Sequence, residues 1–231
     1  MDPAAPQKQR SPWLYVLLGC GGLAALICLG FTVFFLFIAK KGSDMVAGVT
    51  DPTVKAENAK KQLGGVPEGY SVIASLSIFG LMDRTLLADK VDGDGGLVEG
   101  ARLFNYFHVI ANEQNKKTKA FFTGDGDVAA LRNSNVNLRA EDVLKKGSVT
   151  VDGRKIYYVS TRGVMDTGDT RTQGLNNAIL FDCPGDGLSM GVWSQPDPNP
   201  QAKPEELDLA GTVADEAELA KFLKPIDPCG K

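Results

Sequence analysis

The stretch SVTVDGRKIYYVST, residues 148–161, indicates how the central part of this chain folds. Two segments rich in β-branched and aromatic residues, 148–151 and 154–161, are separated by Asp152 and Gly153. Asp-Gly is a preferred pair for the two-residue turn of a β-hairpin, because both positions of that turn need positive φ. The sequence therefore predicts an antiparallel hairpin here.

Further strands are predicted on both sides of this hairpin. Residues 72–79 alternate between two sets of side chains with period two, which is the spacing of a strand. The other predicted strands are residues 81–90, 101–110, 177–183 and 190–194. A polar loop is expected at residues 163–174, and the prolines between 196 and 204 predict an extended connector.

Three helices complete the predicted domain. The first covers residues 53–63, with Asp51 as N-cap and Gly64 after its last turn. The second covers residues 112–122, and the third covers residues 213–223 behind an N-cap at Thr212. Helices at the ends and strands in runs, rather than alternating βα units, indicate an α+β fold with an antiparallel sheet.

An apolar run without any charge precedes this domain at residues 13–38, WLYVLLGCGGLAALICLGFTVFFLFI. At a helical rise of about 1.5 Å per residue it spans roughly 39 Å, more than the roughly 30 Å hydrocarbon core of a bilayer. The run is too long for a cleaved signal peptide, and Lys40 and Lys41 follow it. A lipoprotein cleavage site at Cys20 is disfavoured, because the apolar stretch continues far beyond it.

We therefore predict four parts: a tail at residues 1–12, a transmembrane helix at 13–38, a juxtamembrane linker at 39–50 and a soluble α+β domain at 51–231. Gly21, Ala25, Cys28 and Thr32 share one face of the predicted span, so self-association through small residues is an open possibility.

The orientation of the span is predicted from cysteines, because its positive charges are balanced at the two ends. Cys183 and Cys229 are the only cysteines outside the span. If they form a disulfide, residues 42–231 are extracytoplasmic and the N-terminus is cytoplasmic, since disulfides persist in oxidising compartments. The alternative is two unrelated buried thiols. The chain has no N-glycosylation sequon, which favours a bacterial envelope over a glycosylating secretory route.

The charge balance disfavours nucleic acid as a partner. The chain carries a net charge of −3, and residues 1–41 contribute +3, so residues 42–231 carry −6. Such a field repels nucleic acid and anionic lipid.

Two short motifs suggest hydrolytic chemistry. Gly187-Leu188-Ser189-Met190-Gly191 matches G-x-S-x-G, which requires a following helix and a later histidine. The sole histidine, His108, comes earlier, so a hairpin turn is the preferred interpretation.

Asp166-Thr167-Gly168 matches the aspartic protease tripeptide, and a chain with one such motif would have to dimerise to pair two carboxylates. Thr161-Arg162-Gly163 is expected to interrupt the strand that should lead into Asp166.

Metal and cofactor signals are incomplete. Residues 92–95 with Glu99, and residues 123–127, contain only part of a calcium-loop pattern. His108 has no second histidine to share a zinc ion, and we find no phosphate-binding or dinucleotide motif. We therefore predict no cofactor and no metal.

Together these features predict a single-pass membrane protein with a non-catalytic, extracytoplasmic α+β domain that binds an envelope protein or component. The alternatives are a dimeric aspartic protease that uses Asp166, and a domain that binds a small ligand.

Overall fold

The computed structural model divides the chain into two units, of which the second begins at Met45, and the predicted span at residues 13–38 lies outside the described residues. The described residues are 47–78, 81–93, 95–110, 112–124, 139–166, 171–185 and 187–230. Among these, no helix is both long and apolar enough to cross a bilayer. The unit boundary at Met45 falls inside the predicted linker.

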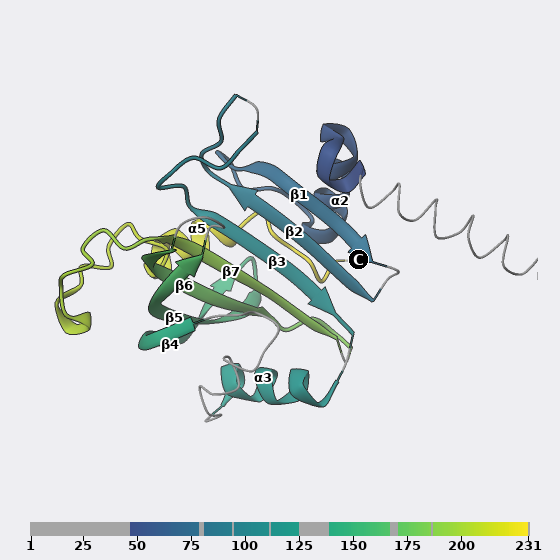
Figure 1. Ribbon diagram of the computed structural model, residues 1–231. Helices are drawn as coiled ribbons and strands as arrows, with labels where there is room; N and C mark the ends of the chain where they lie inside the picture. The colour runs from purple at the N-terminus through teal and green to yellow at the C-terminus, as the bar shows by residue number, and fades with distance from the viewer. Residues whose placement is uncertain are drawn as a thin grey trace, which may run out of the picture. The chain divides into compact units, whose positions relative to one another are not determined.

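A seven-stranded sheet forms the centre of the unit, with strand order β1-β2-β3-β7-β6-β5-β4 and every neighbouring pair antiparallel (Figure 1). The strands are β1 (Ser71–Ile78), β2 (Met82–Ala88), β3 (Leu103–Val109), β4 (Arg139–Val151), β5 (Arg154–Asp166), β6 (Arg171–Phe181) and β7 (Leu188–Pro196). The predicted α+β class with an antiparallel sheet is confirmed.

The helices are α2 (Pro52–Leu63), α3 (Glu113–Thr123) and α5 (Glu216–Leu223), with a short 3-10 helix η1 (Pro204–Glu206). The caps of α2 are those expected: the Asp51 carboxylate accepts the N–H groups of Thr53 and Val54, and the Gly64 N–H donates to the Lys60 carbonyl. Asp152 and Gly153 have φ of 49° and 78° in the β4–β5 turn, so the predicted hairpin is confirmed.

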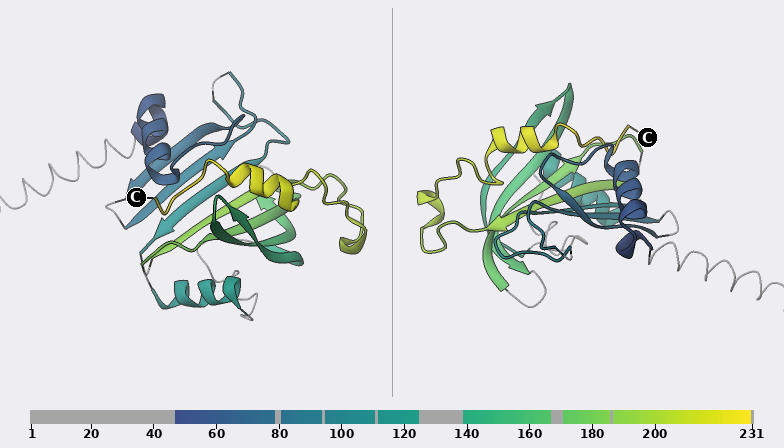
Figure 2. Two further views of the ribbon diagram at one scale, coloured as in Figure 1. Left: turned by 180° about the vertical axis from the view of Figure 1, so that it is seen from behind. Right: turned by 90° about the horizontal axis from the view of Figure 1, so that it is seen from above.

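Two apolar cores lie on opposite faces of the sheet. The first face is covered by α2 and α5, and the second by α3 (Figure 2). The first core includes Leu63, Phe104, Tyr106, Tyr158, Ile179, Trp193, Leu219 and Phe222. The second includes Phe107, Phe121, Phe122, Val159, Leu180 and Met190. Because alternate residues of β5, β6 and β7 point to opposite faces, these strands are buried on both sides.

Three predicted boundaries are wrong, and one of them is the start of β4, which begins at Arg139 and not at Ser148. The loop expected at residues 163–174 is largely strand, because β5 continues to Asp166 and β6 begins at Arg171. The pairing between β5 and β6 continues beyond the apolar core. The residues there do not alternate between apolar and polar, so the sequence gives no strand pattern. Thr161-Arg162-Gly163 therefore does not interrupt the strand.

The third helix starts later than predicted, with Asp215 rather than Thr212 as its N-cap. The backbone groups of Val213 are already bound to sheet side chains, since its N–H donates to Gln195 and its carbonyl accepts from Asn177.

Candidate functional site

A row of four polar residues crosses the first face of the sheet near the turn between β1 and β2. Ser77 is paired with Asp83, Asp83 with His108, and His108 with Ser189, on strands β1, β2, β3 and β7. Because directly paired residues of antiparallel strands point to the same face, the four side chains are neighbours. We call Ser77, Asp83, His108 and Ser189 the polar row.

Hydrogen bonds connect members of this row. The Ser77 hydroxyl donates to Asp83 Oδ1 at 2.7 Å. His108 Nδ1 lies 2.9 Å from Ser189 Oγ, and the imidazole tautomer decides which atom donates. Ser189 is also bonded to the phenol of Tyr106. Burial raises the pKa of that phenol to about 12, and its bond to Ser189 opposes this shift.

Glycine is required next to the histidine ring. A Cβ on Gly187 would lie 2.6 Å from His108 Cε1 and 3.1 Å from its Nε2, closer than ordinary contacts allow. The first glycine of the G-x-S-x-G sequence thus makes room for the imidazole. Ser189 itself is 3% exposed, whereas His108 is only partly buried.

The chemistry open to this arrangement is activation of the Ser189 hydroxyl by the His108 imidazole, as in serine nucleophiles. The strand context differs from a nucleophile elbow. Ser189 is paired with His108 on one side and with Phe181 on the other, so it lies within the sheet ladder and not at a turn into a helix. The hairpin turn expected at this motif is wrong for residues 188–191, which belong to β7, and only Gly187 precedes the strand.

The contact between His108 and Ser189 is the feature that sequence reasoning missed. The two residues are 81 positions apart, and a catalytic order with histidine before serine was not considered. The available signal was weak: one match to a short motif and one histidine in the chain.

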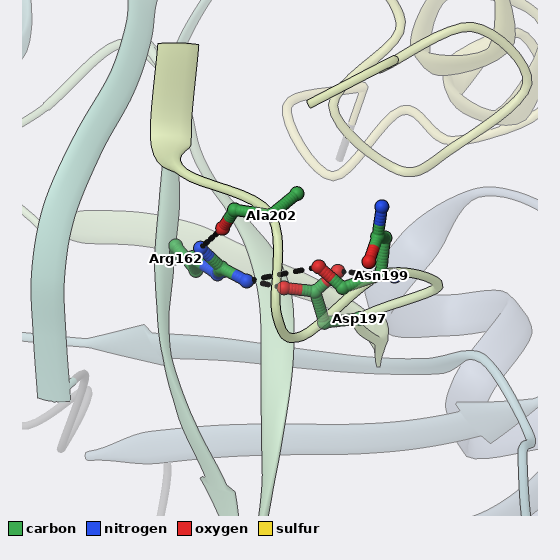
Figure 3. A network of polar contacts seen from close by, with 4 residues as sticks. All are labelled: Arg162, Asp197, Asn199 and Ala202. Atoms are coloured by element: carbon green, nitrogen blue, oxygen red, sulfur yellow. Dashed lines mark hydrogen bonds and ion pairs between the residues drawn. The ribbon is translucent and has the colours of Figure 1, made fainter. Parts of the chain in front are cut away.

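A second polar arrangement is a buried ion pair between β5 and the segment after β7 (Figure 3). Arg162 Nε donates to Asp197 Oδ2 at 2.7 Å, and only 5% and 0% of the two side chains are exposed. The guanidinium also donates to the carbonyls of Ala202 at 2.6 Å and Asn199 at 3.1 Å. Asp197 Oδ1 accepts the Asn199 N–H at 2.8 Å. These contacts hold the proline-containing connector against the sheet.

The cysteines behave as the sequence predicts. Cys183 and Cys229 form a disulfide with a sequence separation of 46, which ties the tail after α5 to the end of β6. Both cysteines pack against the first core.

The other predicted site residues are placed as follows. Asp166 is the last residue of β5 and is paired with Arg171, while Thr167 and Gly168 lie outside the described residues. The Asp92 carboxylate accepts the N–H of Gly96, four residues on, at 2.6 Å within the loop between β2 and β3. Asp94 and residues 125–127 are not described. Within the described ranges, no group of three or more His, Cys, Asp or Glu side chains could hold a metal ion.

No family model, curated protein or solved structure matches this chain.

Proposed function

We propose that this chain is a single-pass membrane protein whose α+β domain lies outside the cytoplasm and acts there as a non-catalytic interaction module. The observation that carries the proposal is the disulfide between Cys183 and Cys229. Disulfides persist in oxidising compartments, and the apolar run at residues 13–38 supplies an anchor that can hold the domain at the outer surface.

The distribution of polar groups supports an interaction role over catalysis. Ser189 is nearly inaccessible, and the ion pair of Arg162 and Asp197 is enclosed by the connector that it holds. Each of these polar arrangements fixes neighbouring strands or loops. The excess of negative charge in residues 42–231 directs the domain toward protein or cationic envelope components and away from nucleic acid.

Topology is tested by fusing a reporter after Lys231. A reporter that is active only outside the cytoplasm should be active, and a reporter that is active only in the cytoplasm should be silent. The reverse pattern would contradict the proposed localisation. Non-reducing mass spectrometry of protein recovered from its native membrane should detect the linked peptides of Cys183 and Cys229. Two free thiols would remove the main support for the proposal.

A second candidate function is acyl transfer through Ser189, which the 2.9 Å contact with His108 favours. The full chain in detergent is treated with a fluorophosphonate probe, which labels activated serines. For an interaction module, we expect the native chain, Ser189→Ala and the matched variant His108→Gln to be labelled to the same extent. Labelling lost in both variants would replace the interaction role with a hydrolytic one.

The aspartic protease alternative is tested on the same preparation. We expect no peptidase activity at acid pH that depends on Asp166. Activity that is present in the native chain and absent from Asp166→Asn would show that the protease assignment is right.

A further inference from the structure

We infer that the uncovered part of the second sheet face binds a helix of another protein, and that a carboxylate of this helix binds Arg84. The inference rests on the proposed role of the domain as an interaction module, and it names the surface and the chemistry of the partner. The surface lies over β1, β2, β3 and the middle of β7.

The side chains of β2 and β3 are buried on the first face of the sheet and accessible on the second. On the first face, Leu87 and Phe104 are fully buried in the core that α2 and α5 cover. On the second face of the same strands, Leu86 and Asn105 are only partly buried and Arg84 is exposed. In Figure 1 this face of β1, β2 and β3 is toward the viewer, and no described segment lies in front of it. The left panel of Figure 2 shows α2 and α5 on the other face.

The accessible side chains form one continuous surface, because directly paired residues of antiparallel strands point to the same face. Leu86 is paired with Ala74 on one side and with Asn105 on the other, and Asn105 is paired in turn with Val192. Most members of this surface are apolar, and all are partly buried or exposed. We call them the open patch: Ala74, Leu76, Arg84, Leu86, Asn105 and Val192.

Helix α3 covers the other part of this face. Its Phe121 and Phe122 pack with Leu180 and Met190 in the second core, and Val192 of the open patch borders that core. An apolar sheet face is normally covered by a second layer of structure. On the first face, α2 and α5 together provide this layer. On the second face α3 leaves the open patch accessible, so one more helix beside α3 would complete the layer.

Arg84 determines the charge that the partner must carry. It is the only charged side chain that the described strands β1, β2, β3 and β7 place on the second face. Its Nε donates to Asn105 Oδ1 at 3.0 Å, which holds the guanidinium on the open patch. Among the described residues, no carboxylate lies within ion-pair distance of it. The two Nη groups can donate a parallel pair of hydrogen bonds to a carboxylate, which is a strong and specific contact.

An arginine among apolar side chains is a typical centre of a protein interface. The net charge of −6 on residues 42–231 does not prevent an acidic contact here. At physiological ionic strength, exposed charges more than about 8 Å apart are largely screened, so the contact residue decides. We therefore expect a partner helix with an apolar stripe at helical spacing that contains one Asp or Glu.

The test places a photo-reactive residue on the open patch of the full chain in its native membrane. Benzoylphenylalanine replaces Leu86, and irradiation links its ketone to C–H groups that are in contact with it. The linked peptides are then sequenced by mass spectrometry. The matched control is the same replacement of Val143, which is 48% exposed but lies on the edge strand β4.

We expect the probe at Leu86 to link to a helix of another protein that carries an Asp or Glu between apolar residues, and the probe at Val143 not to link to it. The probe at Leu76 provides an independent placement if the Leu86 variant fails to fold by circular dichroism. Arg84→Gln should lower the yield of the link by about tenfold, because a hydrogen-bonded charge pair is lost. Lys117→Gln removes an exposed cation of α3 and should leave the yield unchanged. Arg84→Glu should abolish the link, and a lysine in place of the partner's acid should restore it.

Several results would overturn the inference: no link at Leu86 or Leu76, links only to lipid or to a second copy of this chain, a linked helix without an acid, or a yield that Arg84→Gln does not change. Failure of the proposed function gives a different result. A reporter after Lys231 that is active only in the cytoplasm would contradict the localisation, whatever is linked at Leu86. If the reporter is active outside and the open patch does not link, the localisation stands and this docking surface is wrong.

Discussion

We expect substitution of Arg162 or Asp197 to lower the stability of the domain most, because each side chain is buried and is the ionic partner of the other. Asp197→Ala leaves the Arg162 guanidinium enclosed without its carboxylate partner. Removal of one member of a buried pair typically destabilises a protein by about 3–5 kcal/mol. We expect a loss of that size in the free energy of unfolding, measured by urea denaturation.

Two controls separate this effect from other causes. Replacing both residues, with Arg162→Met and Asp197→Leu, should be less damaging than Asp197→Ala alone, since no charge is then left buried. Glu113→Ala breaks an ion pair whose side chains are 68% and 84% exposed, and it should change stability little. Equal losses in all three variants would contradict the explanation.

Single residues also show what the sequence could predict. The sequence named Cys183 and Cys229 as a possible pair, because only these two cysteines lie outside the predicted span, and the structure shows the disulfide between them. The contact between His108 and Ser189 could not be predicted. It depends on β7 lying beside β3, and no local pattern records which distant strands become neighbours.

Among the elements, helices and hairpins were the easiest to predict. Helix α2 has the expected caps, and the β4–β5 turn has the expected Asp-Gly conformation. Strand β4 was not recognised before Ser148, although it begins at Arg139. It is an edge strand with two register shifts, and its residues at 142, 143, 145 and 146 are exposed, so it lacks hydrophobic alternation. Charge and bulges are how edge strands avoid pairing with other chains.

The tail after α5 is an element that we expect to depend on its disulfide. In the chain-entropy model, a bridge across 46 residues stabilises by up to roughly 4 kcal/mol, since it restricts the unfolded chain. The double variant Cys183→Ser and Cys229→Ser should therefore have a free energy of unfolding that is lower by up to that amount, measured by urea denaturation.

Reductant gives the control for the disulfide. It should destabilise the native chain by a similar amount and leave the double variant unchanged. A native chain that is insensitive to reductant would show that the bridge contributes nothing to stability.

For the whole molecule, we expect stability to fall at alkaline pH. Burial raises the pKa of Tyr70 and of Tyr106 from 10.0 to about 12; Tyr106 belongs to the first core, and Tyr70, directly before β1, packs against it. Because the folded pKa is raised, this contribution is fully present below pH 10 and is lost as the pH rises through about 12.

The measurement is urea denaturation across this alkaline range, with a spectrophotometric titration of the phenols. Native protein should contain phenols that ionise near pH 12, and unfolded protein should not. Tyr106→Phe should remove one of them and weaken the alkaline loss of stability. Ionisation of every phenol near pH 10 in the folded chain would disprove the expected burial effect.

The position of β7 has a consequence for how the molecule is made. It is the last of the seven described strands in chain order, and yet it lies in the middle of the sheet, between β3 and β6. Until residues 188–196 have been synthesised, the three-stranded sheet β1-β2-β3 and the hairpins β4-β5-β6 each have an open edge where β7 belongs. Such edges pair readily with other chains. The nascent protein is therefore most prone to aggregate just before its last strand arrives, and a helper that shields strand edges would be needed most at that moment.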